Sequence, residues 1–73
     1  MIEKEVARRF GLNLLLARRE ARISQDDLAK GAFMDRAALS RIENGHRLPR
    51  LDHMVRIAGV LDIPIRDLFH GIG

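Results

Sequence analysis

Residues 24–45 read SQDDLAKGAFMDRAALSRIENG, and this stretch decides the fold of the chain. Its first part predicts a short helix that begins at Ser24 and ends near Gly31. The Ser24 hydroxyl can accept a hydrogen bond from a free backbone N–H of the first turn, as helix N-caps do. Leu28 and Ala29 supply the buried side. The stretch therefore opens with one short amphipathic helix.

A second helix is predicted over residues 36–44. Asp35 is its N-cap candidate, and Gly45 stands just past its end, where a left-handed residue is favoured. Leu39 and Ile42 fall on its buried side. The residues of the opposite, exposed side recur at helical spacings: Arg36, Ala37, Ser40, Arg41 and Asn44.

Two short helices joined by a tight turn form a helix-turn-helix arrangement. In this motif the second helix lies in the DNA major groove and the first crosses the phosphate backbone. Arg36 and Arg41 suit guanine O6 and N7 or a phosphate, and the Ala37 methyl suits a thymine methyl. The Ser40 hydroxyl adds a polar contact. Gln25, beside free backbone N–H groups at the start of the first helix, predicts a phosphate contact.

On the N-terminal side, a helix is predicted over residues 3–22. Four residues form one apolar stripe on it: Phe10, Leu14, Ala17 and Ala21. Three leucines widen this stripe beyond what one core face needs: Leu12, Leu15 and Leu16. Two interpretations remain open, a broad buried face or a surface that binds a protein partner.

On the C-terminal side, a basic connector over residues 46–50 precedes two further helices. Arg47 and Arg50 of the connector are predicted to contact phosphate. The fourth helix spans residues 51–61, and a fifth begins at Pro64. The expected fold is a compact all-α domain of five short helices, and the expected organisation is a single domain over residues 1–73.

The charge composition points to a nucleic-acid partner. Lys and Arg number 13 against 10 Asp and Glu, the formal net charge is +3, and 11 of the 13 cations are Arg. Arg presents a planar fork that grips phosphate and guanine edges. A small, basic, Arg-rich domain therefore favours nucleic acid as the ligand.

Several other classes of protein are excluded. The longest apolar run, Leu14–Ala17, is far shorter than the ~20 residues of a membrane span. Residues 1–9 contain no hydrophobic segment, so no secretory signal is expected. There is no cysteine, and the three histidines share no metal-binding spacing, so no metal or cofactor is expected. We expect a cytoplasmic protein.

An enzyme is not expected either. Ser40 has no His or Lys base at a recognisable spacing, and a serine nucleophile needs such a base. The chain also contains no glycine-rich phosphate loop. A binding function is therefore predicted.

The chain resembles the lambda-repressor-like helix-turn-helix family, also called the Cro/CI or xenobiotic-response-element type. The resemblance covers Ala17–Phe69, and residues 10–16 fit more loosely. It depends on a combination of features: Ser24 and Gln25 at the start of a helix, the run LSRIENG over residues 39–45, and Pro49. Apolar positions complete the combination: Leu28, Ala29, Ile57, Ala58, Leu61, Leu68 and Phe69. Small members of the family include phage Cro-like repressors, controller proteins of restriction–modification systems and antitoxins, and the turn over residues 34–36 somewhat resembles that of the controller proteins.

This resemblance implies roles for individual residues. Gln25 and Asn44 would contact the DNA backbone, and the bases would be faced by Arg36, Ala37 and Arg41. Arg18 would pair with Glu43 and tie the first helix to the recognition helix. By resemblance to the repressors, a dimer interface is expected in the C-terminal half, at Leu51, Ile65, Arg66 and Asp67.

The chain departs from the family at four positions. Arg22 and Phe33 stand where the family has glycine, and Arg50 and Pro64 replace small capping residues. A residue other than glycine forced to positive φ costs about 1 kcal/mol. Either these two turns differ locally or the strain is tolerated.

Two functions are compared. The first is a sequence-specific transcriptional regulator that binds double-stranded DNA as a homodimer on a two-fold operator. The second is a protein-interaction module or antitoxin-like protein that binds its partner through the leucines of residues 3–22.

Overall fold

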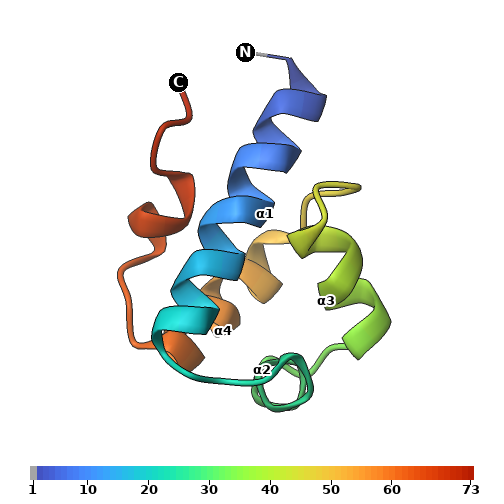
Figure 1. Cartoon of the computed structure of the whole chain (residues 1–73), viewed down its shortest axis with the longest axis vertical. Helices are drawn as coiled ribbons and strands as arrows, with labels where there is room; N and C mark the ends of the chain where they lie inside the picture. Colours follow the sequence, from blue (N-terminus) through green and yellow to red (C-terminus); the bar gives the residue numbers. More distant parts are fainter. Residues whose placement is uncertain (1) are drawn as a thin grey trace.

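The computed structural model describes residues 2–73, which are helical throughout their regular parts (Figure 1). The elements in chain order are α1 (Glu3–Glu20), α2 (Gln25–Gly31), α3 (Arg36–Glu43), α4 (Leu51–Leu61) and a 3₁₀ turn, η1 (Ile65–Phe69). The described part of the chain contains no strand, so the all-α prediction is confirmed. It also contains no helix long and apolar enough to cross a membrane.

The prediction of five helices is wrong, because η1 is a 3₁₀ segment. Pro64 is its N-cap, and the backbone N–H of Asp67 donates to the Pro64 carbonyl at 3.0 Å, a bond that spans three residues. Five residues offer few bonds of the longer α type, so the tighter turn costs little here. It places Leu68 in the core and sets the Phe69 ring edge-on to Phe10, with the ring centroids 5.4 Å apart.

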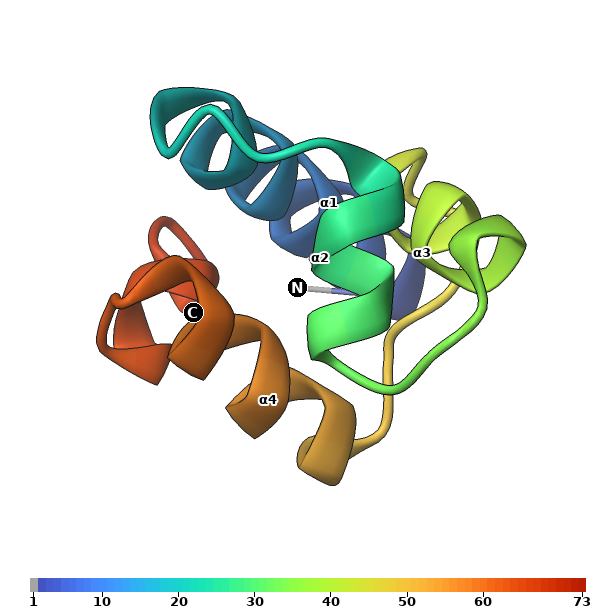
Figure 2. The same ribbon diagram turned by 90° about the horizontal axis from the view of Figure 1, so that it is seen from below.

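The core lies around α1, which has α3 on one side and η1 on the other (Figures 1 and 2). All five elements contribute fully buried large side chains: Phe10, Leu14, Leu28, Leu39, Ile42, Ile57 and Leu68. The apolar positions of the helix-turn-helix stretch therefore pack on α1 and α4, and α3 is left with one face free.

Two glycines let α3 approach α1 closely. A Cβ on Gly11 would lie 2.3 Å from the Ile42 carbonyl oxygen. Gly45 has a φ of +78°, and a Cβ there would lie 2.9 Å from the Cα of Arg8. The C-terminal end of α3 is therefore held against the backbone of α1.

All four helices end in the same hydrogen-bonded turn. After α1, the N–H of Ile23 donates to the Arg18 carbonyl at 3.2 Å, and the equivalent bonds are made by Met34, His46 and Ile63. This pattern, the Schellman motif, needs one left-handed residue. Only α3 supplies glycine there; the other three turns use Arg22 (φ 59°), Phe33 (φ 55°) and Asp62 (φ 55°).

The turns at Arg22 and Phe33, where the family has glycine, therefore adopt the left-handed conformation that glycine favours, and the strain is tolerated. The residue after each strained position is apolar and packs against the core: Ile23, Met34 and Ile63. This contact accompanies the Schellman motif and offsets the conformational cost. The need for a left-handed residue at Asp62 was not expected from the sequence.

The helix starts agree largely with the sequence. Ser24 caps α2 by accepting the Asp27 N–H at 3.1 Å. Asp35 and Arg50 occupy N-cap positions but make no side-chain cap bond. Asn44 is the C-cap of α3 rather than its last residue, and α1 ends at Glu20, two residues earlier than expected.

Candidate nucleic-acid interface

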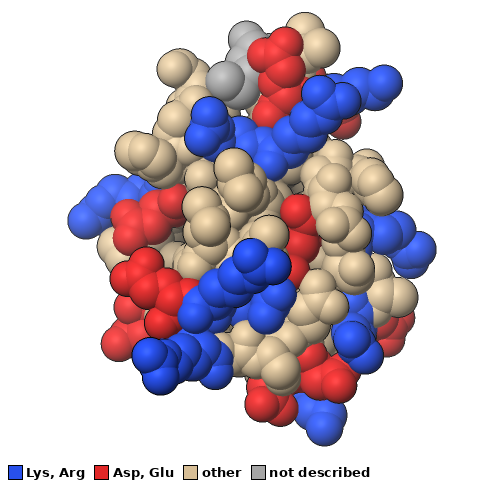
Figure 3. All heavy atoms as spheres, viewed as in Figure 1, with Lys and Arg blue, Asp and Glu red and all other residues tan. Residues whose placement is uncertain are grey.

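The outer face of α3 is the one that the sequence predicted. Arg36, Ala37, Arg41 and Asn44 are exposed and Ser40 is half-buried, whereas Leu39, Ile42 and Glu43 are buried. Figure 3 shows Lys and Arg side chains on the edge of the molecule where α3 lies, with acidic side chains between them. The face is thus polar and partly basic, and it is free to enter a groove.

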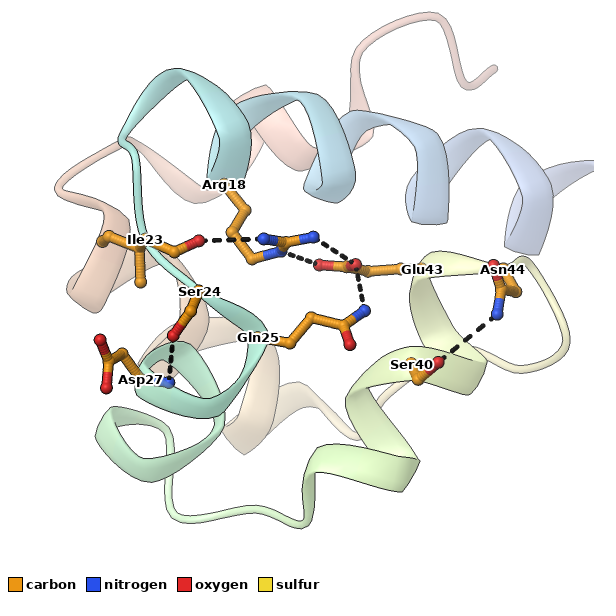
Figure 4. A network of polar contacts seen from close by, with 8 residues as sticks. All are labelled: Arg18, Ile23, Ser24, Gln25, Asp27, Ser40, Glu43 and Asn44. Atoms are coloured by element: carbon orange, nitrogen blue, oxygen red, sulfur yellow. Dashed lines mark hydrogen bonds and ion pairs between the residues drawn. The ribbon is translucent and has the colours of Figure 1, made fainter.

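A buried ion pair holds α3 to α1 (Figure 4). The Arg18 guanidinium donates from Nε to Oε2 of Glu43 at 2.6 Å and from Nη2 to Oε1 at 3.1 Å. The side chains of Arg18 and Glu43 are only 13% and 2% exposed. The predicted pairing of Arg18 with Glu43 is therefore confirmed as two parallel hydrogen bonds, a geometry specific to Arg.

The same network reaches the start of α2. The third nitrogen of Arg18, Nη1, donates to the Ile23 carbonyl at 2.9 Å, and the Gln25 amide donates to Oε1 of Glu43 at 2.8 Å. The carboxylate of Glu43 thus accepts three hydrogen bonds from two side chains. One charged group fixes α1, α2 and α3 relative to one another.

This network differs from the phosphate contact that the sequence predicted for Gln25. The sequence placed its side chain on a phosphate, but its amide N–H is directed inward to Glu43. Asp26 and Asp27 follow it in the first turn of α2, and their charges disfavour a phosphate there. A DNA contact by Gln25 stays a prediction, with the second N–H of its side-chain amide and its backbone N–H as the donors left to make it.

The arginines of α3 differ in their surroundings. Nε of Arg36 lies 3.5 Å from Oδ1 of Asp26, and both side chains are more than half exposed. An ion pair this exposed contributes little and yields readily to a phosphate or base. Arg41 makes no ion pair in the described part of the chain. Both arginines are therefore available to a ligand.

The basic connector between α3 and α4 contains two arginines of different kinds. Arg47 is exposed, whereas Nη2 of Arg50 lies 3.1 Å from Oδ2 of Asp52. Desolvation of the Asp52 carboxyl acts to raise its pKa, but the Arg50 guanidinium and the His53 backbone N–H outweigh it, so the pKa lies below its usual value. Asp52 therefore competes with any phosphate for Arg50.

Two further basic residues lie beside the connector and were missed from the sequence. Lys4 of α1 lines a small hollow together with His46 and Arg47. Arg8, one turn later on α1, lies against Gly45. A basic pair four residues apart on one helix was the only signal in the sequence. Its place next to the connector follows from the packing of α1 on α3.

The helix-turn-helix arrangement is also found in known proteins that are similar to this chain. The model of a family described as Helix-turn-helix matches residues 14–68, about three quarters of the chain. This chain belongs to the helix-turn-helix family. The expected resemblance to its Cro/CI type is thereby confirmed, and the helix-turn-helix protein is a DNA-binding transcription regulator by family.

One solved structure is similar over nearly its whole length. It is the restriction-modification controller protein C.AhdI from Aeromonas hydrophila, with 33% sequence identity and a TM-score of 0.82. The match covers 86% of this helix-turn-helix protein and 96% of the other chain. No curated protein matches.

The residues predicted at a dimer interface are spread over α4 and η1. Leu51 is 69% exposed, whereas Ile65 is half-buried and packs against the core of this helix-turn-helix protein. Arg66 and Asp67 are exposed. Val55, one turn after Leu51, is 57% exposed and lines the same shallow surface, which the sequence did not predict.

The burial of the α1 leucines tests one of the two interpretations of its wide stripe. Leu12 and Leu16 are 44% and 54% exposed, and Leu15 is half-buried. Ala21, expected in the buried stripe, is exposed. The broad buried face is therefore wrong at Leu12 and Leu16, which form an exposed apolar ridge on α1 of this helix-turn-helix protein. A protein partner for this ridge stays a prediction.

Proposed function

We propose that this protein is a sequence-specific transcriptional regulator that binds a two-fold operator as a homodimer. The observation that carries this proposal is the rigid presentation of α3. Its outer face is free, and the network of Arg18, Gln25 and Glu43 fixes its angle to α1 and α2. Such preorganisation suits reading of base edges, because the helix does not have to be ordered on binding.

The proposed contacts divide into two classes. Arg36, Ala37 and Arg41 read base edges in the major groove, with Ser40 and Asn44 beside them. The phosphate backbone is contacted by cations around the connector: Lys4, Arg8, Arg47 and Arg50. The first class supplies sequence preference, and the second supplies most of the salt-dependent affinity.

Dimerisation is proposed because one small module reads only a few base pairs. Leu51 and Val55 offer the apolar centre of the contact, and the exposed Arg66 and Asp67 of η1 offer a polar rim. Each copy contributes the same surface, as a two-fold axis requires. Similarity to a restriction-modification controller protein supports a regulatory rather than an enzymatic role.

Selection from random double-stranded DNA, followed by sequencing, tests the proposal. We expect enrichment of an inverted repeat whose half-sites are about one helical turn apart from centre to centre. Enrichment of a single unrepeated half-site would reject the homodimer while keeping DNA reading by α3. No enrichment at low salt would reject sequence-specific DNA binding.

A further inference from the structure

A groove runs between α1 and the C-terminal part of the chain. Its volume is about 500 Å³, and α1 contributes one wall. The other wall consists of the end of α4, the loop after it and η1 with its following residue. We call it the α1–η1 groove; its lining is Asn13, Leu16, Ala17, Glu20, Ala21, Leu61, Ile63, Asp67 and His70.

The exposed apolar ridge of α1 leads into this groove. Leu12 and Leu16 are four residues apart, so they lie one turn apart on the same side of α1. Leu16 lines the groove and is 54% exposed. Ile63 and Leu61 continue the apolar floor from the opposite wall. Leu16 is therefore an exposed apolar side chain beside an apolar floor.

The charges at the groove differ from those of the whole chain. The chain has a net charge of +3, yet none of the nine lining residues is Lys or Arg. Glu20 and Asp67 place carboxylates on its two opposite walls. A ligand that crosses the groove would therefore meet an acid on each side of an apolar floor.

We propose that the α1–η1 groove binds a basic amphipathic helix of a partner protein. A helix laid in a groove presents apolar residues at spacings of three and four, which Leu16, Leu61 and Ile63 can receive. Lys or Arg on the flanks of that helix would reach Glu20 and Asp67. The proposed partner segment is therefore a helix with one apolar face and Lys or Arg on its flanks.

This binding goes beyond the proposed function; it shares Asp67 with the rim proposed for the dimer but none of the residues proposed to contact DNA. In both ribbon views η1 and α3 lie on opposite sides of α1 (Figures 1 and 2), and the groove is lined by residues of α1 and η1. A partner in the groove would leave the outer face of α3 free.

Two synthetic peptides test the proposal by fluorescence anisotropy, with amide shifts recorded in two-dimensional NMR spectra. Both are helix-forming peptides of about 16 residues with one leucine face, one carrying Lys on its flanks and the other Glu. We expect the Lys peptide to bind roughly five-fold more tightly, with shifts confined to the groove lining. Leu16→Gln should weaken its binding about ten-fold.

Ile2→Gln is the control, because it makes a similar apolar-to-Gln exchange at an exposed residue outside the groove and outside the proposed DNA and dimer contacts. It should leave both peptide binding and the mass of the protein in solution unchanged. Equal binding of the two peptides, or shifts outside the groove, would overturn the proposal. A loss of dimer mass in Leu16→Gln would overturn it too, since a second copy would then occupy the groove.

Discussion

At the scale of the residue, Arg41 is the sharpest candidate for reading a base. It is exposed on α3, it makes no ion pair in the part of the chain described, and the fully buried Leu39 and Ile42 hold the opposite side of the helix in the core. We expect Arg41→Ala to leave the melting temperature nearly unchanged. It should weaken the cognate site by about 1–3 kcal/mol and relax preference at one base pair per half-site. Competition binding with single-base operator variants measures this.

Arg47→Ala is the control for Arg41, since it removes the same charge from the exposed connector. If Arg47 contacts only phosphate, its loss should weaken cognate and random DNA about equally. A uniform loss in Arg41→Ala as well would show that Arg41 also clamps phosphate. Arg36 would then be the better candidate for base reading.

At the scale of the element, the helix ends contain strain that glycine would relieve. Arg22 has a φ of 59° in the turn after α1, where an L side chain is disfavoured. Arg22→Gly should therefore stabilise the fold by about 0.5–1 kcal/mol, because it removes this penalty at an exposed site. Urea unfolding followed by circular dichroism measures the change.

Arg19→Gly is the matched control within the same helix. Arg19 is exposed and lies inside α1, so glycine there should cost about 1 kcal/mol. The opposite signs of the two substitutions separate backbone strain from loss of a positive charge. Destabilisation by both would show that the Arg22 side chain contributes more than its strained backbone costs.

At the scale of the whole molecule, the cations around the connector should make DNA binding strongly dependent on salt. Lys4, Arg8, Arg47 and Arg50 could each neutralise a phosphate in each half-site. Each neutralised phosphate contributes roughly −0.9 to the slope of log K against log salt. The slope for a dimer should therefore be steeper than about −4. A titration from low to moderate salt gives the slope. A value near zero would contradict DNA binding through these residues.

The assembly itself gives another prediction. Leu51→Asp should yield a folded monomer, because Leu51 is 69% exposed and a buried unpaired carboxylate disfavours the contact between copies. Sedimentation should report the monomer mass at concentrations where the wild type is dimeric. Leu12→Asp, on an exposed leucine of α1, is the control and should keep the dimer. Ile65→Asp is a poorer test, since Ile65 also packs against the core.

Most of the fold could be read along the chain, because helix signals are local. Leu28, Leu39 and Ile42 recur at spacings that face one side of a helix, and all three are fully buried. Ser24 is the N-cap that its side chain predicted. The segment after Pro64 was misread as an α-helix, since five residues contain too little periodicity to distinguish a 3₁₀ turn from a helix.

The amino-acid sequence by itself determined which face of α3 turns outward, since that depends only on which residues are apolar. It also determined the family, through the run from Leu39 to Gly45 in its context. Tertiary structure alone decided where side chains from distant segments meet. It turned the Gln25 amide to Glu43, set Lys4 beside Arg47 and left Leu16 uncovered in a groove. These outcomes depend on the angles at which α1, α3 and η1 pack, and helix periodicity carries no information about those angles.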